Sequence, residues 1–247
     1  MAQSKLDVRT QDGVMDVSLH APEGPGPFPT VLLYFDAGGL RPSMHEMAER
    51  LVARGYFVAL PNVFYRAGAY EPFDLRSVWT NPAERARVMA LVKQANPGAV
   101  MQDTAALLEA LDHEPRARAQ KVGCVGYCMG GRLAFTAAGA HPERVAAAAC
   151  IHGGHIASDE PDSPHLQAGR IRAALYFGVA DNDASCTPES QARLKAALDA
   201  ADVRYRIEVF SGAAHGFAVR DMPAYSEAAA ERQWERVFAL FAEELPR

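Results

Sequence analysis

Cysteine is scarce in this sequence: there are four, at positions 124, 128, 150 and 186 of 247 residues. So few cysteines in a chain of this length do not make the framework of a disulfide-stabilised secreted domain. Their spacing is neither the CxxC of redox proteins nor the paired spacing of a metal site. We therefore expect free thiols, no metal ion and a cytoplasmic location.

Long apolar runs and excess positive charge are also absent. No apolar stretch approaches the roughly 18 residues of a membrane span, and the N-terminus lacks the apolar core of a signal peptide. The net charge of -5 gives no basic footprint for a nucleic acid. We expect neither a membrane nor a nucleic-acid partner, and a monomer or weak homodimer.

What the chain does have is a high apolar content, 49%, which is ample for a sizeable core. Its length allows one large α/β domain or two small ones. No internal repeat, low-complexity tract or linker-like composition divides it. The simpler prediction is a single domain over residues 1–247.

Apolar segments typical of buried strands alternate with helical patterns along most of the chain. Predicted strands occupy residues 30–35, 56–60, 121–125, 145–151, 171–179 and 203–210. Predicted helices occupy residues 43–54, 82–94, 98–113, 129–140, 187–201 and 223–244. Residues 5–20 alternate apolar and polar side chains around Asp12-Gly13, which is typical of an antiparallel hairpin. The alternation predicts an α/β fold with a mostly parallel central sheet and helices on both faces.

One glycine-rich segment, Gly126-Tyr127-Cys128-Met129-Gly130, joins a predicted strand to a predicted helix. Small residues two positions before and after Cys128 give the spacing of a nucleophile elbow, with cysteine in place of the usual serine. The glycines let strand and helix approach, and the helix N-terminus favours a thiolate and an oxyanion. The pentapeptide alone is also compatible with a buried structural cysteine in a turn.

Chemically capable side chains directly follow several predicted strands, where α/β sheets carry their active sites. They are Asp36, Cys128, His152, Asp181 or Asp183, and His215. The order of nucleophile, acid and histidine is that of the α/β-hydrolases. Cys128 is then expected to attack a carbonyl carbon, with His215 as the proton carrier and an aspartate holding the imidazole.

The backbone N–H groups of Ala37 and Met129 are the candidates for an oxyanion hole. Simpler interpretations remain for some residues: the segment around His215 can be an ordinary turn. His152 and His155 are interpreted as loop histidines that shape the pocket or hydrogen-bond locally. The other three cysteines are interpreted as small buried apolar residues.

With these motifs in place, the sequence resembles the dienelactone hydrolases (carboxymethylenebutenolidases), a branch of the α/β-hydrolase superfamily whose nucleophile is cysteine. The likeness covers almost the whole chain. It is carried by residues 126–131, 47–61 and 214–220, and by the closing helix with Trp234. The resemblance implies an α/β-hydrolase fold and hydrolysis of a small lactone or carboxylic ester without a cofactor.

Residue by residue, the resemblance implies a triad of Cys128, His215 and Asp183, with Asp181 as the alternative acid. Well-studied members carry a glutamate that holds the resting thiol and helps to ionise it. This chain has Asp36 there, which either does the same or only positions the loop. Substrate carboxylates in the family are held by arginines, for which Arg220 is the first candidate. Further candidates are Arg41, Arg76 and Arg85.

Two other functions fit the same residues. One is a general carboxylesterase or thioesterase with no preference for dienelactones. The other is a non-catalytic α/β-hydrolase homologue that binds a small ligand or senses oxidants through Cys128.

Overall fold

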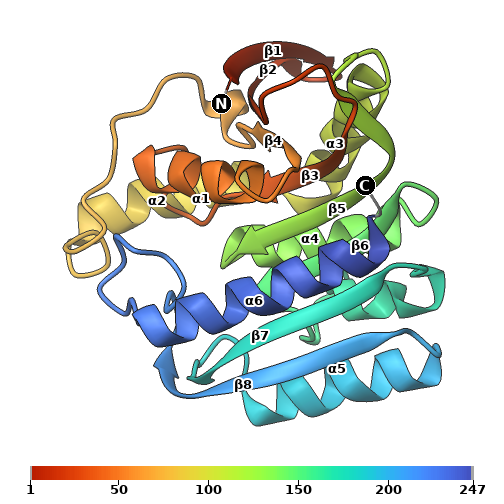
Figure 1. The fold of residues 1–247 in the computed structure, drawn as a ribbon. Coiled ribbons are helices and arrows are strands. Elements are labelled where there is room, and N and C mark those ends of the chain that lie inside the picture. Colours follow the sequence, from red (N-terminus) through yellow and green to blue (C-terminus); the bar gives the residue numbers. More distant parts are fainter. Residues whose placement is uncertain (1, 246–247) are drawn as a thin grey trace.

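A computed structural model describes residues 2–245 of the chain (Figure 1). Its strands form one sheet of eight, in the order β1-β2-β4-β3-β5-β6-β7-β8. Their bounds are β1 Ala2–Thr10, β2 Gly13–Ala21, β3 Phe28–Tyr34, β4 Phe57–Pro61, β5 Ala117–Tyr127, β6 Val145–Ile151, β7 Ala174–Asn182 and β8 Tyr205–Ala214. β1 and β2 form the expected antiparallel hairpin, and β2 pairs antiparallel with β4. The remaining neighbours are parallel, which confirms the predicted sheet.

Helices cover both faces of the sheet. They are α1 Pro42–Val52, α2 Pro82–Gln94, α3 Pro97–Leu111, α4 Met129–Ala140, α5 Pro188–Ala200 and α6 Glu227–Glu244, with short 3-10 turns η1 Tyr65–Ala67 and η2 Pro164–Arg170. Figure 1 shows α1 and α6 in front of the sheet, whereas α4 and α5 both pack against η2. Within residues 2–245 no helix is long and apolar enough to cross a membrane.

Proline and side-chain caps fix where several helices begin. α1, α2, α3 and α5 each start at a proline, whose missing N–H costs nothing in the first turn. The side chains of Asn81, Asn96 and Thr187 accept hydrogen bonds from the first free amides of α2, α3 and α5.

Strands β3 and β4 are buried along almost their whole length, as their apolar sequences predict. Val31, Leu32 and Leu33 have no exposed surface. Each such side chain contributes about 1.5–3 kcal/mol on burial, so this core holds the strand ends firmly in place.

Several strands extend beyond their predicted ends: β5 runs over Ala117–Tyr127 instead of 121–125, and β7 and β8 end furthest from the predicted positions. β7 begins at Ala174, because Ile171 ends the η2 turn instead of starting the strand, and it continues to Asn182. β8 continues to Ala214, past the predicted end at residue 210. The extensions place Asp183 and His215 directly at the carboxyl ends of two neighbouring strands.

The strand order reverses between β3 and β5. The chain passes from β3 to β4 on one side, and then crosses to β5 on the other side of β3. Open α/β sheets bind ligands outside the carboxyl ends of the strands at such a reversal. Here these ends lead into the loop at Asp36 and into Cys128.

Candidate active site

Cys128 lies on a sharp turn between β5 and α4, with φ 54° and ψ -118°. The left-handed φ is uncommon for a residue with a side chain, and such strain concentrates at functional sites. A Cβ on Gly126 would collide with the carbonyl oxygen of Gly130, and one on Gly130 with that of Tyr34. Both flanking glycines are therefore required for the close approach that defines the elbow.

Cys128 faces a histidine from a distant part of the chain. Cys128 Sγ lies 2.9 Å from Nε2 of His215, which directly follows β8. All four cysteines of the chain are free. Cys128 is only partly buried, whereas the other three are buried. The structure thus brings the predicted nucleophile and proton carrier into hydrogen-bonding distance.

Asp183, in the loop after β7, contacts the other nitrogen of the His215 ring. Its Oδ2 lies 2.7 Å from His215 Nδ1, and its Oδ1 accepts hydrogen bonds from the backbone N–H and the hydroxyl of Ser185 at 2.8 and 2.6 Å. Asp181 lies elsewhere, exposed, and accepts the Gly212 amide at 3.1 Å. The geometry therefore brings Asp183, and not the alternative Asp181, to the imidazole.

Two opposing effects set the charges of this pair. Burial alone raises the pKa of Asp183, but hydrogen bonds from His215 and Ser185 outweigh it, so that its pKa is lowered. Burial lowers the pKa of His215, yet the partners Asp183 and Cys128 outweigh burial and raise that pKa to about 10. The raised pKa of His215 therefore favours the protonated imidazole near neutral pH.

The predicted oxyanion-hole residues lie beside the elbow: Ala37 is in the loop after β3, and Met129 is the first residue of α4. β3 pairs with β5, and the start of α4 packs so closely on the end of β3 that Gly130 abuts the carbonyls of Tyr34 and Phe35. Neither Ala37 N–H nor Met129 N–H donates to a protein acceptor within the described residues. Two backbone donors beside a nucleophile can stabilise the charge that develops on an attacked carbonyl oxygen.

Asp36 is buried and forms an ion pair with Arg41. Arg41 donates to its two carboxylate oxygens at 2.7 and 2.8 Å, and the Gly38 amide donates to Oδ1 at 2.8 Å. The same guanidinium donates to Asp221 at 2.7 and 3.0 Å. In the part of the chain that the structure describes, Asp36 makes no hydrogen bond to Cys128. Arg41, a candidate for the substrate carboxylate, is already paired twice.

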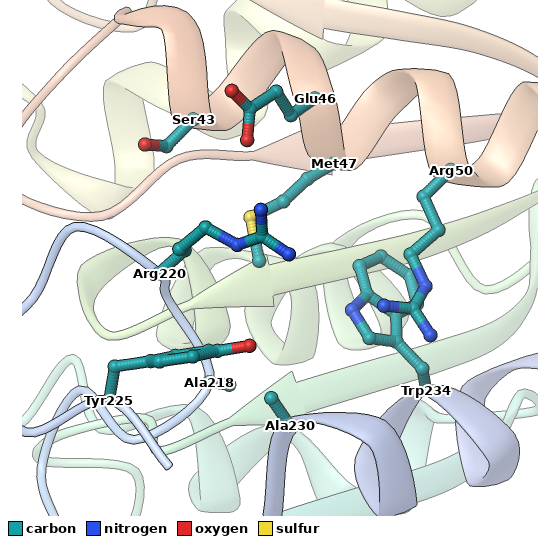
Figure 2. Close-up of a pocket in the computed structure, with 9 residues that line it drawn as sticks. All are labelled: Ser43, Glu46, Met47, Arg50, Ala218, Arg220, Tyr225, Ala230 and Trp234. Carbon is teal, nitrogen blue, oxygen red and sulfur yellow. The ribbon is translucent and has the colours of Figure 1, made fainter. Parts of the chain in front are cut away.

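Arg220 reaches from the loop after β8 into a cavity of about 120 Å³ between α1 and α6 (Figure 2). The cavity is lined by Ser43, Glu46, Met47, Arg50, Ala218, Arg220, Tyr225, Ala230 and Trp234. None of these is a triad residue, so the structure does not place Arg220 in the same cavity as Cys128. Arg76 and Arg85 are exposed.

Several contacts around the site were not predicted from the sequence. The backbone contact of Ser185 has a sequence signal, because an aspartate in a turn commonly accepts a hydrogen bond from the backbone two residues on. The pairing of Asp36 with Asp221 through Arg41 has no sequence signal, since the aspartates are 185 positions apart. His152 is predicted to shape the pocket or hydrogen-bond locally, and the structure adds that its ring contacts the backbone of Cys128 and the ring of His215.

The fold and this arrangement define a class of protein. A mostly parallel sheet, a strained turn at Cys128 after β5, and a cysteine, an aspartate and a histidine brought together in that chain order are the features of an α/β-hydrolase. Within residues 2–245 no group of three or more His, Cys, Asp or Glu side chains is placed to hold a metal ion.

Comparisons with known proteins define the family. The model of the dienelactone hydrolase family matches residues 15–245. A Synechocystis protein provisionally named a carboxymethylenebutenolidase is 25% identical over 232 residues, which cover 92% of this chain and 91% of that protein. The chain belongs to the dienelactone hydrolase family and is a hydrolase.

Solved structures agree on the fold. A protein of Klebsiella pneumoniae provisionally described as a dienelactone hydrolase superposes with a TM-score of 0.83 at 23% identity, over 98% of both chains. A dienelactone hydrolase-like promiscuous phosphotriesterase from metagenomic libraries gives 0.75 at 22% identity, over 99% of both chains. At such identities the likeness shows the α/β-hydrolase fold alone.

Proposed function

We propose that this hydrolase cleaves a small lactone or carboxylic ester through a thioacyl intermediate on Cys128. The observation that carries the proposal is the unbroken line from Cys128 Sγ to His215 to Asp183, at 2.9 and 2.7 Å. The oxidant-sensing and ligand-binding alternatives do not require this alignment beside two unused amides.

In the first half of the reaction, Sγ attacks the carbonyl carbon of the substrate as a thiolate, with its proton on His215 Nε2. The developing oxyanion accepts hydrogen bonds from the amides of Ala37 and Met129. When the tetrahedral intermediate collapses, the carbon–oxygen bond to the leaving group breaks. His215 gives its proton to the departing oxygen, leaving a thioester on Cys128.

In the second half, His215 takes a proton from a water molecule that attacks the thioester carbon. The same amides hold the second oxyanion, and its collapse breaks the carbon–sulfur bond. The carboxylic acid leaves, and the thiolate–imidazolium pair is restored. Asp183 keeps Nδ1 hydrogen-bonded and stabilises the imidazolium, so that Nε2 stays directed at Sγ.

Asp36 is assigned to the loop and not to the thiol. Its carboxylate is held by Arg41 and the Gly38 amide, and it lies one residue before the oxyanion donor Ala37. A carboxylate engaged in this way orients the oxyanion loop, while ionisation of the thiol falls to His215. Arg220 remains the candidate for a substrate carboxylate, which would then reach toward the cavity between α1 and α6.

The test compares turnover of p-nitrophenyl acetate and of cis- and trans-dienelactone by the wild type, Cys128→Ala and Arg220→Gln. We expect Cys128→Ala to lose turnover of every substrate. Arg220→Gln is expected to raise KM for the carboxylate-bearing lactones while leaving that for the neutral ester unchanged.

The relative rates decide the substrate class. Faster turnover of the lactones supports a dienelactone hydrolase, whereas a preference for the simple ester supports a general carboxylesterase. If the wild type turns over none of them and iodoacetamide does not alkylate Cys128 near neutral pH, the catalytic proposal is wrong and a binding function replaces it.

A further inference from the structure

A buried histidine outside the triad contacts the nucleophile and the proton carrier together. His152 directly follows β6, beside the end of β5, and is 1% exposed. Its Nδ1 lies 3.1 Å from the backbone nitrogen of Cys128. Its ring packs against that of His215, with centroids 5.2 Å apart and planes inclined at 60°.

The hydrogen bond fixes the form of this imidazole. A backbone N–H can only donate, so Nδ1 carries the lone pair and the proton lies on Nε2. The titratable groups around the ring are Cys128, His215, Asp183 and Tyr127. Burial and then the charge of His215 lower the pKa of His152 to about 3, so the ring stays neutral beside an imidazolium.

Two features of His152 cost the fold free energy. Its φ of 38° lies in the left-handed region, although its own amide is anchored on Gly178 O at 2.7 Å. Its Nε2 is buried and finds no hydrogen-bond partner within residues 2–245. The aromatic rings of Tyr127 and Phe217 lie beside it, with centroids 5.9 and 5.3 Å away. An apolar side chain would avoid the unpaired N–H, so the cost calls for a functional reason.

We propose that His152 is a positioning residue for the reaction: its Nδ1 holds the Cys128 amide in the strained elbow while its ring supports His215. The inference rests on the proposed function of Cys128. The Cys128 amide also donates to Ile151 O at 3.0 Å, so it is shared between two acceptors and would stay paired without His152. His152, which follows Ile151 at the end of β6, adds a second acceptor for this amide. Its ring also packs against the imidazole of His215.

Three substitutions separate the hydrogen bond from the packing. In His152→Asn the side-chain oxygen stands two bonds from Cβ, where Nδ1 stands. In His152→Gln it stands three bonds from Cβ, where Nε2 stands, so this variant is the matched control. His152→Phe keeps a ring against His215 but removes the acceptor and the unpaired N–H.

The measurements are kcat and KM for p-nitrophenyl acetate, the pH profile of Cys128 alkylation by iodoacetamide, and the Tm of each variant. We expect His152→Phe and His152→Gln to lower kcat about tenfold, because the second acceptor that orients the Cys128 amide is lost, with KM within about twofold. His152→Asn should recover most of kcat and the wild-type alkylation profile. His152→Phe should melt no lower than the wild type, because it removes an unpaired buried donor.

Several results would contradict the proposed role of His152. Wild-type kcat and alkylation in His152→Gln and His152→Phe would overturn the inference, as would equal damage in the Asn and Gln variants. If His152→Phe does not fold, the comparison of Asn with Gln still decides. Cys128→Ala, run beside them, separates the two claims: full turnover in that variant refutes the proposed function, whereas its inactivity with indifferent His152 variants refutes only the role of His152.

Discussion

Asp183 and Asp181 lie two positions apart in the chain, yet only one of them reaches the imidazole. Both follow the same run of apolar residues, and the sequence leaves either as the acid. The structure separates them by the end of β7: Asp181 is still within the strand and exposed, whereas Asp183 is past its end and turned inward. Ser185 then binds the inner carboxylate and fixes its orientation.

We therefore expect Asp183→Asn to lower kcat by about 10⁴-fold, the size of the same change in a serine triad, because the amide favours the wrong imidazole tautomer. Asp181→Asn is the matched control, with the same change of charge on an exposed side chain, and should keep wild-type kcat. Steady-state turnover of p-nitrophenyl acetate measures both. The reverse ranking would assign the acid to Asp181.

Among the secondary-structure elements, Arg41 links two loops near the site through ion pairs. Arg41 comes immediately before α1, and its guanidinium joins Asp36 in the loop after β3 to Asp221 in the loop after His215. The carboxylate of Asp36 is 4% exposed and that of Asp221 36%. The two ion pairs should therefore contribute very differently to stability.

Arg41→Met leaves the buried Asp36 charge without its partner and should lower the free energy of unfolding by about 3–5 kcal/mol. Asp221→Asn breaks the more exposed pair, which is worth about 1 kcal/mol or less. Urea unfolding followed by circular dichroism measures both variants against the wild type. Equal losses in the two variants would show that the buried pair has no special weight.

Elements were easier to predict than the places where they end. Alternating apolar strands and helical patterns sufficed for the six long helices, the mostly parallel sheet and the hairpin. The ends of β7 and β8 were missed because Asp181, Asn182 and Gly212 suggest a turn, while pairing between the two strands extends them. Propensity within one segment carries no information about what its neighbour in the sheet offers.

In the candidate site, too, contacts between residues close in sequence could be predicted, and contacts between distant residues could not. The elbow could be predicted because its residues are close in sequence: the spacing of Gly126, Cys128 and Gly130 alone is typical of this turn. The link from Arg41 to Asp221 and the contact of His152 with Cys128 join distant parts of the chain. They follow from strand order and register, which periodicity does not encode.

For the molecule as a whole, the His215–Asp183 pair ties stability to pH. The pKa of His215 is raised to about 10 in the folded protein, above the value of about 6.5 in an unfolded chain. Between those values the folded state binds more protons than the unfolded state, so the stabilisation falls as pH rises. It is fully present below about pH 6.5, until Asp183, whose pKa is lowered, takes up a proton at acidic pH.

The difference in free energy of unfolding between the wild type and His215→Gln should therefore be largest in weakly acidic solution. It should shrink steadily as the pH approaches about 10. Urea denaturation of both proteins at a series of pH values measures it. A difference that grows with rising pH would mean that His215 is neutral in the folded protein.

The central claim is that an acyl group passes through Cys128, and its most direct test is to catch that group. Wild type and Cys128→Ala are mixed with p-nitrophenyl acetate, quenched in acid within the first turnovers, and measured by intact mass and peptide mapping. We predict a transient gain of one acetyl group, mapped to Cys128 in the wild type and absent from Cys128→Ala, together with a burst of p-nitrophenol. Sustained turnover by Cys128→Ala, or an acetyl group found only on another residue, would contradict the thioacyl mechanism.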